Sequence, residues 1–504
     1  MKHEIPKEVG AIAAMLEQGG FSAYLVGGCV RDILLKREPK DWDIATSATP
    51  EEIQKIFTES VYENTFGTVA VKTESEDPRL RIVEVTTFRK DGAYTDRRHP
   101  DSVSFAKAVE EDLSRRDFTV NALALDGSGV YVEDGSVSGG RGQRSRVPKG
   151  VVDPCGGQKD LKEGLIRAVG NPDDRFKEDA LRLIRAVRFA AELGFEIEFE
   201  TRRAIERHAG LLEAIAAERV RDELVKMLMA PGASRGVVLL EELDLLRHVL
   251  PDLREGLGVA QNLHHIYTVF EHNIRALDYA AKENCSLAVR LAALLHDVGK
   301  PRTKRGEGKH ATFYGHEVVG AKMAVRALDR LRFPKDVVEQ VVHLVRFHMF
   351  YYNVGEVSEA GVRRFLNRVG PECVDDLLKV READRIGSGV PKAVPYKNRH
   401  LQFMIEKVKR DPISPKMLKV DGKDVMRAAH IEPSREVGEI LGVLLEEVLD
   451  DSQKNELDYL EKRILELHAL GEKERAKFAS AARERKEEFE SGLEEEIKGK
   501  YRVK

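Results

Sequence analysis

The chain has 504 residues, more than three times the roughly 150 residues of a typical domain, so we expect several separate hydrophobic cores. Its 82 Lys and Arg residues nearly balance its 86 Asp and Glu residues, and the formal net charge of −4 excludes a polybasic protein that holds nucleic acid by bulk electrostatics alone. No apolar run approaches the roughly 18 residues of a membrane helix and the four cysteines form no CxxC pair, so we expect a soluble, reduced, cytoplasmic protein with no membrane contact, no disulfide framework and no cysteine zinc site.

Residues 1–130 combine one helix with several short strands. The spacing of apolar residues predicts a helix over 7–18, and acidic residues interrupt the apolar stretch that a signal peptide would need. Runs of β-branched and apolar residues predict strands at 23–28, 67–72 and 81–88. These elements indicate an α+β or α/β fold for the N-terminal part of the chain.

Residues 134–150 are rich in Gly, Ser and Arg and lack apolar periodicity. This composition predicts an exposed basic loop or hairpin tip. A solvated insertion explains the loop better than a phosphate-binding role does.

From residue 173 onward, apolar residues recur at three- and four-residue steps, which predicts a nearly all-helical remainder. Stretches rich in Gly and Pro place joints near residues 232 and 412. A 3,4,3 apolar spacing precedes the charged C-terminal run and involves Leu457, Leu460, Ile464 and Leu467. Because this apolar seam is short, it predicts a solvated helical hairpin or extended helix and not a coiled coil.

Two short motifs in the N-terminal part indicate a phosphate and metal site. In LVGGCVRD, Gly27 and Gly28 end a strand before a helix, and such a turn lets backbone N–H groups approach a phosphate. In DWDI, Asp41 and Asp43 project from the same face of a strand and offer two oxygen ligands to Mg²⁺. Two metals held this way activate an attacking hydroxyl and neutralise a leaving pyrophosphate. Glu84, in RIVEV, is a candidate third carboxylate, with an exposed strand glutamate as the alternative.

This pattern resembles the DNA polymerase β-like nucleotidyltransferases, and further motifs narrow the resemblance. They are RRDFTVNAL at 115–123, EDALRLIRAVRF at 178–189 and ERVRDEL at 218–224. They resemble, in the same order, motifs of the class II tRNA nucleotidyltransferases, the CCA-adding enzymes, and of the related bacterial poly(A) polymerases. The resemblance covers most of the chain and implies template-independent addition of nucleotides from CTP and ATP to the 3′ end of tRNA.

Asp179 and Arg182 stand at i and i+3, a spacing that places them on one face of a predicted helix. A carboxylate accepts a hydrogen bond from the exocyclic amine of C or A, and a guanidinium donates to the neighbouring ring acceptor, whereas U and G present a carbonyl oxygen there. Such a pair selects C and A without a template. The alternative is a surface ion pair, which Glu178 and Arg182 would also form; the family resemblance favours base recognition.

The resemblance also assigns nucleotide contacts to other residues. Arg115, Asp117 and Asn121 would hold the ribose 2′-hydroxyl and the triphosphate, because an arginine offers a fork of donors and an asparagine both donates and accepts. The complete expected nucleotide-binding set is Gly27, Gly28, Arg31, Arg115, Asp117, Asn121, Asp179, Arg182, Arg185 and Arg188.

Smaller features bear on the product of the reaction. ENTFGTVAV at 63–71 resembles the CCA-adding pattern, and the GRRF-like signature that we associate with poly(A) polymerases is missing. Residues 88–100 resemble a flexible loop of the family that CC-only enzymes lack. These features favour full CCA addition over poly(A) or A-only addition. The departures from the pattern are His99 and the basic insertion at 134–150, and they leave the alternatives open.

A second site is predicted in the helical part, where the apolar helix LAALLHDVGK ends in an adjacent His-Asp pair. This motif and its neighbours resemble an HD-superfamily phosphohydrolase. The resemblance implies as metal ligands His272, His296, Asp297 and Asp384, with the extra pair of two-metal members, His316 and His348. Mixed imidazole and carboxylate ligation favours a transition metal such as Ni²⁺, Mn²⁺ or Co²⁺ over Mg²⁺, and a bound water of lowered pKa would attack a phosphate ester. Rival ligands are His264, His265 and His343.

The combination is functionally coherent, because a tRNA end with a 2′,3′-cyclic or terminal phosphate cannot accept a nucleotide until the phosphate is cleared. The chain resembles HD-containing CCA enzymes, and its expected parts are a nucleotidyltransferase head at 1–170, a helical neck at 171–232, a helical body with the HD domain at 233–412, and a helical tRNA-contacting region with a charged tail at 413–504. A third hypothesis is an HD phosphohydrolase with a noncatalytic RNA-binding N-terminal domain; the paired aspartates argue against it.

Overall fold

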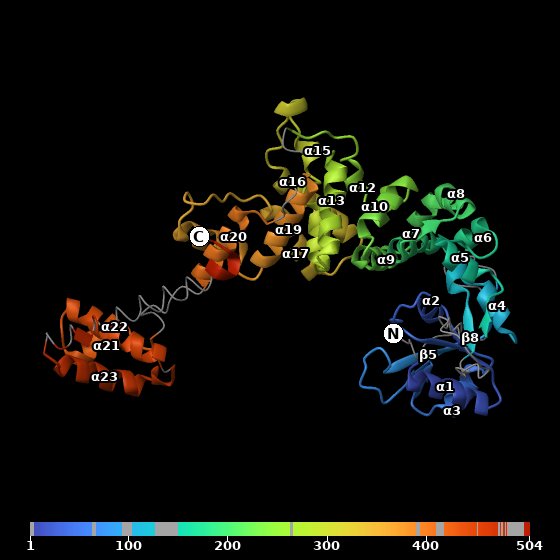
Figure 1. The fold of residues 1–504 in the computed structure, drawn as a ribbon, viewed down its shortest axis with the longest axis horizontal. Coiled ribbons are helices and arrows are strands. Elements are labelled where there is room, and N and C mark those ends of the chain that lie inside the picture. Colours follow the sequence, from blue (N-terminus) through green and yellow to red (C-terminus); the bar gives the residue numbers. More distant parts are fainter. Residues whose placement is uncertain are drawn as a thin grey trace, which may run out of the picture. The chain divides into compact units, whose positions relative to one another are not determined.

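The computed structural model describes residues 5–62, 67–92, 103–126, 150–262, 266–389, 394–409, 418–450, 452–471, 474, 477, 478, 480 and 498–503. Contacts divide the chain into two compact units, residues 1–348 with 376–391 and residues 349–375 with 392–504. The chain changes from a sheet with helices to helices alone (Figure 1), as expected from the change in apolar period. The finer division into head, neck, body and C-terminal region stays a prediction. No described helix is long and apolar enough to cross a membrane.

A mixed seven-stranded sheet forms the N-terminal part, in the order β3-β4-β5-β2-β1-β8-β9. Its strands are β1 Ala23–Val26, β2 Asp43–Thr46, β3 Ser60–Tyr62, β4 Thr68–Lys72, β5 Ile82–Thr87, β8 Ala124–Asp126 and β9 Val151–Val152. β2 and β5 pair in parallel and the other neighbours pair antiparallel. The predicted strands are therefore confirmed with slightly shorter bounds, and the predicted mixed α and β fold is confirmed.

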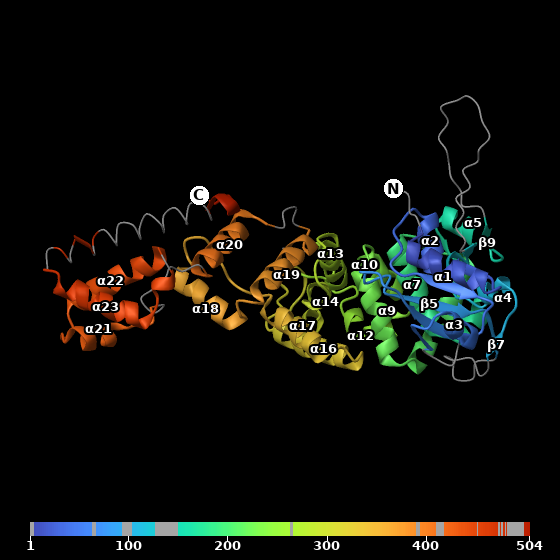
Figure 2. The ribbon, with the colours of Figure 1, turned by 90° about the horizontal axis from the view of Figure 1, so that it is seen from below.

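Helices pack on this sheet through their apolar faces. The predicted helix over 7–18 is confirmed as α1 Lys7–Gln18, which buries Val9, Ile12, Ala13 and Leu16 at the expected spacing. The other helices here are α2 Gly28–Leu34, α3 Pro50–Ile56, α4 Val109–Ser114 and α5 Gly157–Glu163. α1 and α3 contact each other and the sheet (Figure 2). Short pairs of strands, β6 Arg89–Asp91 with β7 Val103–Phe105 and β10 Leu165–Ile166 with β11 Glu196–Ile197, complete the strands of the described residues.

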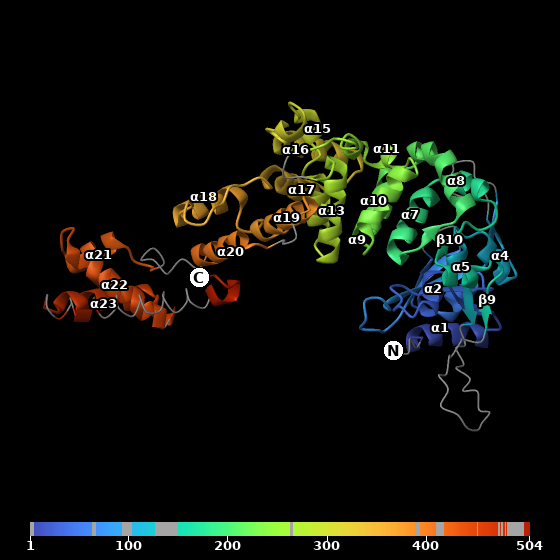
Figure 3. The same cartoon turned by 45° about the horizontal axis from the view of Figure 1, so that its top comes forward.

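Helices follow the sheet without further long strands. They begin with α6 Pro172–Glu178, α7 Leu181–Leu193, α8 Phe199–His208, α9 Ala217–Met229 and α10 Ala233–Glu242. α7 contacts both α9 and α10 (Figure 3). The prediction that Asp179 and Arg182 share one helix face is wrong, because Asp179 has extended backbone angles and separates α6 from α7.

The next helices surround α14 Leu287–Leu295, whose residues from Ala288 to Leu295 are all buried. They are α11 Leu246–Val249, α12 Pro251–Arg254, α13 Val269–Lys282, α15 Lys300–Thr303, α16 His316–Arg330, α17 Lys335–Phe347 and α19 Val374–Gly387. α14 contacts α13 and α17 along its length. A helix of this kind, in which the buried Arg290 is the one charged residue, is stable only when neighbours cover it on every side.

The second unit contains α18 Glu359–Val369, α20 Tyr396–Lys409, α21 Gly422–Ala429, α22 Arg435–Asp450 and α23 Leu457–Ala469. The last three helices enclose a hydrophobic core of their own. Leu460, Ile464 and Leu467 of α23 are fully buried in that core, whereas Leu457 is half exposed. The prediction of a solvated seam is therefore wrong, because α21 and α22 supply the partners that the short apolar seam needs.

Candidate nucleotide and metal sites

Three carboxylates meet where β2 and β5 pair. Asp43 is the first residue of β2 and lies opposite Glu84 of β5 in the parallel register. Burial and the negative charges of Asp41 and Glu84 raise the pKa of Asp43 to about 7, although the Arg116 guanidinium opposes this rise. A half-buried carboxylate beside two others carries excess negative charge, which a divalent cation would balance. The carboxylates named by sequence therefore lie close enough to act on one another electrostatically, which we call the carboxylate cluster, although among the described residues their oxygens do not all lie within 4.8 Å of one another.

Gly27 and Gly28 lie against this cluster. A Cβ at Gly27 would lie 2.8 Å from Nη1 of Arg116 and 3.8 Å from Oδ2 of Asp43, and a Cβ at Gly28 would lie 3.7 Å from Oδ1 of Asp41. Gly27 also has a φ of +76°, which L side chains rarely adopt. Backbone conformation therefore favours a glycine at position 27, and the turn between β1 and α2 lies beside the carboxylates and Arg116.

An open cavity of about 330 Å³, which we name the head cavity, extends from the carboxylates to the helices that follow the sheet. It is lined by Val26, Asp43, Glu84, Thr86, Arg115, Arg116, Asp117, Asp179, Leu181, Arg182, Arg185 and Arg219. Predicted residues from four separate segments of the sequence therefore share one cavity. The predicted residues that do not line it are Asp41, Gly27, Gly28, Arg31, Asn121 and Arg188.

Asp179 and Arg182 both line the head cavity, and each is held by a different neighbouring side chain. Arg219 of α9 donates to both oxygens of the Asp179 carboxylate, at 2.9 and 3.3 Å. Nη1 of Arg182 donates to Oε2 of Glu178 at 2.6 Å. The carboxylate of Asp179 also accepts the backbone N–H of Leu181 at 3.0 Å and so caps the start of α7. The two base-recognition candidates therefore present polar groups whose positions are set by neighbours, and Arg219 is a site residue for which the sequence motif gave no role.

A second ion-pair group lies beside this pair. Nε of Arg185 donates to Oδ2 of Asp117 at 2.7 Å. Burial opposes ionisation of Asp117, but Arg185 and Arg182 outweigh it and lower the pKa of this carboxyl. Glu223, which is buried, lies 2.6 Å from Nε of Arg188 and 3.6 Å from Nη1 of Arg185. Arg188 therefore supports the wall of the head cavity without lining it, and Glu223 is a further support that sequence reasoning did not single out.

Arg31 and Asn121 form a buried link behind the head cavity. Nη1 of Arg31 donates to Oδ1 of Asn121 at 2.9 Å, and Nε of Arg31 donates to Oδ1 of Asp32 at 2.8 Å. Both Arg31 and Asn121 are buried. They tie α2 to the segment that precedes β8, so in this structure they position neighbouring backbone and do not face the cavity.

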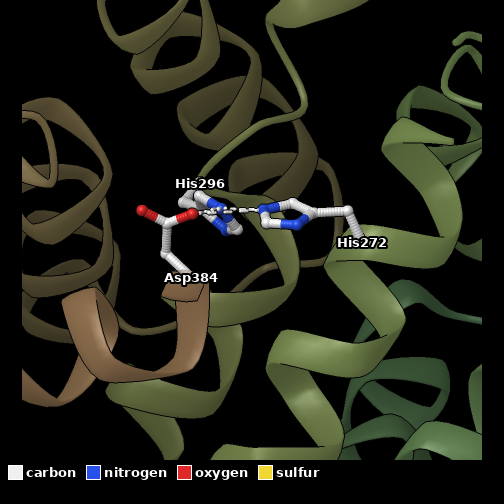
Figure 4. A group of neighbouring side chains, drawn as sticks. All are labelled: His272, His296 and Asp384. Atoms are coloured by element: carbon white, nitrogen blue, oxygen red, sulfur yellow. Dashed lines mark hydrogen bonds and ion pairs between the residues drawn. The ribbon is translucent and has the colours of Figure 1, made fainter. Parts of the chain in front are cut away.

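Six predicted ligands of the helical part converge in what we name the HD cluster, consisting of His272, His296, Asp297, His316, His348 and Asp384. Ligand atoms of His272, His296 and Asp384 lie within 4.8 Å of one another, and so do those of Asp297, His316 and His348. Figure 4 shows the first group, with its side chains meeting from three separate segments. Oδ2 of Asp297 lies 3.1 Å from Nε2 of His272, and Oδ1 lies 3.3 Å from Nε2 of His316. Asp297 therefore contacts both groups.

Hydrogen bonds orient three of the imidazoles. Nδ1 of His296, His316 and His348 lies 2.7 to 2.8 Å from the carbonyl oxygen of the residue three positions earlier. Because a carbonyl only accepts, Nδ1 carries the proton in the neutral ring and the Nε2 lone pair faces the cluster. This is the arrangement that metal-ligating histidines use.

Two glycines allow the helices of the HD cluster to approach closely. A Cβ at Gly387 of α19 would lie 2.8 Å from the carbonyl oxygen of His272, and a Cβ at Gly299 would lie 2.3 Å from the carbonyl oxygen of His316. Nζ of Lys300 lies 2.6 Å from Oδ2 of Asp297. Gly299 and Lys300 directly follow the His-Asp motif, a signal available in the sequence, whereas nothing local marks Gly387.

The remaining predictions concern the rival histidine ligands and three segments of the N-terminal part. His343 contacts the ring of Phe347 and belongs to neither ligand group among the described residues. His264 and His265 lie outside the described residues. The expected flexible loop is described only over 88–92, residues 63–66 of the ENTFGTVAV motif lie outside the description, and the basic loop at 134–150 lies outside it except for Gly150.

Comparison with protein families gives three consecutive matches. Residues 23–167 match the poly A polymerase head domain, residues 194–257 match the probable RNA and SrmB-binding site of polymerase A, and residues 269–386 match the HD domain. The first match contains Asp41, Asp43 and Glu84, and the third contains the whole HD cluster.

Individual relatives match over most of the chain. The A-adding tRNA nucleotidyltransferase of Deinococcus radiodurans is 37% identical over 359 residues, which cover 69% of this chain and 76% of that protein. The CCA-adding enzyme of Enterococcus faecalis is 32% identical over 470 residues, which cover 93% of this chain and 97% of that enzyme. The crystal structure of the Bacillus stearothermophilus CCA-adding enzyme in complex with CTP aligns with a TM-score of 0.58 at 28% identity, over 91% of this chain and 96% of that one.

Proposed function

Because the chain belongs to the tRNA nucleotidyltransferase family of the CCA-adding and A-adding enzymes, we propose that it adds C, C and A to the 3′ end of tRNA, using CTP and ATP. The observation that carries this proposal is the head cavity, where Asp43 and Glu84 share one space with Asp179 and Arg182. The CCA-adding relative from E. faecalis, which matches nearly the full length of both chains, supports this product.

The carboxylate cluster fits Mg²⁺, because its donors are all oxygens and their mutual repulsion raises the pKa of Asp43 to about 7. Asp41, Asp43 and Glu84 would hold two ions, which lower the pKa of an attacking 3′-hydroxyl and neutralise a leaving pyrophosphate. On the facing wall, Arg115 and Arg185 would bind phosphate oxygens.

Selection of C and A falls to Asp179 and Arg182. The Asp179 carboxylate would accept from the exocyclic amine of either base, and the Arg182 guanidinium would donate to the adjacent ring nitrogen. Arg219 and Glu178 keep the two side chains apart, since each already holds one of them. The cavity therefore does not have to break an Asp179–Arg182 pair before it accepts a base.

We propose a second activity at the HD cluster, the hydrolysis of 2′,3′-cyclic or terminal phosphates on RNA ends. Four imidazoles and two carboxylates fit transition metals such as Ni²⁺, Mn²⁺ or Co²⁺ better than Mg²⁺. Such ions would lower the pKa of a bound water so that it attacks phosphorus at neutral pH. In three of the histidines Nδ1 is hydrogen-bonded to a backbone carbonyl, so Nε2 faces the cluster, which supports this assignment.

A-only addition is the second candidate product, because the D. radiodurans relative, at 37% identity, is an A-adding enzyme. Poly(A) addition and a noncatalytic RNA-binding head are weaker alternatives. The carboxylate cluster opposes the noncatalytic alternative, since a binding domain has no need of three mutually repelling carboxylates.

One experiment separates these products. Transcripts of a tRNA that end at the discriminator base, at C or at CC are incubated with each NTP and with CTP plus ATP, and the product ends are sequenced. We expect all three to be completed to CCA and extended no further. Extension of the CC transcript alone would identify an A-adding enzyme, and long A tracts would identify a poly(A) polymerase.

A further inference from the structure

Two neighbouring arginines of the head cavity share one buried carboxylate, that of Asp112 in α4. Nε and Nη2 of Arg115 donate to Oδ1 of Asp112 at 3.0 and 2.6 Å, and Nη2 of Arg116 donates to Oδ2 at 3.2 Å. The arginines follow Asp112 at i+3 and i+4, a spacing that places both side chains next to it at the end of α4. Each oxygen of the carboxylate therefore holds a different arginine.

Asp112 itself does not reach the head cavity. It is 1% exposed and does not line the cavity, whereas Arg115 and Arg116 both line it. Burial raises the pKa of the Asp112 carboxyl, but the two guanidiniums outweigh burial and lower that pKa, so Asp112 is ionised. A buried charge of this kind acts on a ligand only through the residues that it holds.

Arg116 has a second carboxylate within reach, that of Asp43 in the carboxylate cluster. Nη1 of Arg116 and Oδ2 of Asp43 lie 2.8 and 3.8 Å from the same point, the position that a Cβ at Gly27 would occupy. The Arg116 guanidinium also opposes the rise in the pKa of Asp43, so the two charges act on each other. Among the described residues no hydrogen bond or ion pair joins Arg116 to Asp43, and Arg116 pairs with Asp112 instead.

The partner of Arg116 decides what Asp43 can bind. A guanidinium paired with Asp43 would occupy carboxylate oxygens that the proposed Mg²⁺ needs, and its positive charge would repel the ion. When Asp112 holds Arg116, the guanidinium still lines the cavity, where it would attract phosphate, but the oxygens of Asp43 are left to the cation.

We propose that Asp112 is a positioning residue that holds Arg116 away from Asp43, so that Asp43 remains available to Mg²⁺; this inference rests on the Mg²⁺ site proposed above. Without Asp112, Arg116 would pair with Asp43 and compete with the ion. Asp112 thereby keeps a cation-binding group and an anion-binding group separate in one cavity whose walls carry both charges.

Calorimetric titration of Mg²⁺ into the full-length protein without nucleotide tests this role, with Asp43→Asn as the baseline that lacks the site. For Asp112→Asn we expect the Mg²⁺ dissociation constant to be about tenfold larger than in the wild type, because the released Arg116 pairs with Asp43. Adding Arg116→Gln to Asp112→Asn should restore the wild-type value or a tighter one, since the competing guanidinium is gone. A merely structural loss would not be rescued by this second substitution.

Two results would overturn the inference while the wild type binds Mg²⁺ normally. They are an unchanged Mg²⁺ affinity in Asp112→Asn and a double variant that binds Mg²⁺ as weakly as Asp112→Asn does. A wild type that binds no more Mg²⁺ than Asp43→Asn would instead overturn the proposed Mg²⁺ site, and this inference with it.

Two further variants control for charge and for the loss of a buried ion pair. Glu111→Gln makes the same change from carboxylate to amide one residue earlier in α4, on an exposed side chain. Asp160→Asn removes another buried carboxylate, whose partner Arg167 does not line the head cavity. Both variants should keep the wild-type affinity for Mg²⁺.

If Asp112→Asn does not fold, a crystal structure of the wild type with Mg²⁺ and a nonhydrolysable CTP analogue decides. Arg116 should still contact Asp112 in that complex, with Mg²⁺ on Asp43. An Arg116 side chain that has left Asp112 when Mg²⁺ is bound would overturn the inference.

Discussion

Burial, the Asp41 carboxylate and the Glu84 carboxylate all raise the pKa of Asp43, because each makes a negative charge on this side chain less favourable. A cation beside Asp43 would relieve all three effects. The pKa of Asp43 is raised above the ordinary value, so the folded protein holds a proton that the unfolded chain has already released. Stability from this group is present below about pH 4 and is lost as the pH rises through about 7, the folded-state pKa. A divalent cation offsets this loss, and protons and metal therefore compete for the same carboxylate.

This competition predicts a pH-dependent affinity for Mg²⁺. At pH 6 the Asp43 carboxyl, with a pKa of about 7, is mostly protonated, so binding must release a proton. We expect the Mg²⁺ dissociation constant to be about tenfold larger at pH 6 than at pH 8. Calorimetric titration of Mg²⁺ into wild type and Asp43→Asn isolates Mg²⁺ binding at the head, because the variant should lose this binding at both pH values. The prediction would be contradicted if the Mg²⁺ affinities of wild type and variant differed by the same factor at pH 6 and pH 8.

Arg219 is expected to control base selection through Asp179, whose carboxylate it holds at two oxygens. In Arg219→Gln the Asp179 carboxylate loses its charged partner, and we expect the preference for C and A over U and G to fall about tenfold, an effect of about 1 to 2 kcal/mol. Single-nucleotide incorporation assays on a CC-ending tRNA measure it. A uniform fall in rate with unchanged ratios would show that Arg219 only supports the fold.

Arg221→Gln is the matched control for that assay. Arg221 lies two residues away on the same helix, and its guanidinium contacts Asp222 and the carbonyl of Arg332 instead of the head cavity. It should lower stability slightly, if at all, and leave the base preference unchanged. A similar loss of preference in both variants would indicate that α9 as a whole, and not the Arg219–Asp179 contact, sets selection.

At the scale of helices and strands, the sequence predicted those elements whose cause is local. α1 follows from apolar spacing, and the largely buried α14 follows from a mostly apolar run that only Arg290 interrupts. The break at Asp179 has only a weak local signal, an aspartate before the apolar-periodic residues of α7, since neither Gly nor Pro stands between Glu178 and Arg182. It depends on Arg219, forty positions away, which binds the carboxylate that also caps α7. Tertiary contacts of this kind override helix propensity and cannot be read from one segment.

The same limit applied to the sites. The HD ligands could be placed from their family pattern, and the structure brings all six together. Arg31, Asn121 and Arg188 were expected to contact nucleotide by the same reasoning. They do not line the head cavity, Arg31 pairs with Asn121 and Arg188 with the buried Glu223, and their contact with nucleotide stays a prediction. A motif identifies residues that matter for a site, whereas burial and pairing decide which of them face the ligand.

Close approach of α19 to α13 predicts that Gly387→Ala damages the HD cluster. The added Cβ would lie 2.8 Å from the carbonyl oxygen and 3.0 Å from Nδ1 of His272, so α19 must move and carry Asp384 with it. We expect metal affinity and phosphoester hydrolysis at the HD cluster to fall at least about tenfold, with a destabilisation of about 1 to 3 kcal/mol. Nucleotide addition to an intact 3′-hydroxyl should be retained.

Metal content after dialysis and hydrolysis of a 2′,3′-cyclic nucleotide check this prediction. Gly438→Ala is the matched control, because Gly438 is also a helical glycine but no atom lies within 4 Å of its Cβ position. It should keep wild-type metal content and be neutral or slightly stabilising. Normal metal binding by Gly387→Ala would show that α19 tolerates the displacement.

At the scale of the whole molecule, the chain combines two kinds of ligand chemistry. The head offers oxygen donors alone, and the HD cluster mixes imidazole nitrogen with carboxylate oxygen. No residue belongs to both sites, and the matched family domains that contain them are separate, at 23–167 and 269–386. Each activity should therefore be removable without the other.

Separate sites predict that two inactive variants complement each other on a damaged tRNA end. A tRNA that ends in CC with a 3′-phosphate has no free 3′-hydroxyl, so the phosphate must be hydrolysed at the HD cluster before the head adds A. His296→Ala should fail on this RNA but add A normally to the dephosphorylated one. Asp43→Ala should release phosphate but add no A, with at least about a thousandfold loss of nucleotidyl transfer.

Mixing the two variants should restore addition of A to the phosphorylated tRNA, because the product of one variant is the substrate of the other. Gel analysis of the RNA end and a phosphate-release assay follow the two steps separately, with Mg²⁺ and one of Ni²⁺, Mn²⁺ or Co²⁺ present. Omitting the transition metal should block only the phosphorylated RNA, since the all-oxygen donors of the head favour Mg²⁺. Addition of A to the phosphorylated RNA by His296→Ala alone would disprove the order of steps. If the mixture released phosphate but added no A, the repaired end would not pass from one molecule to the other.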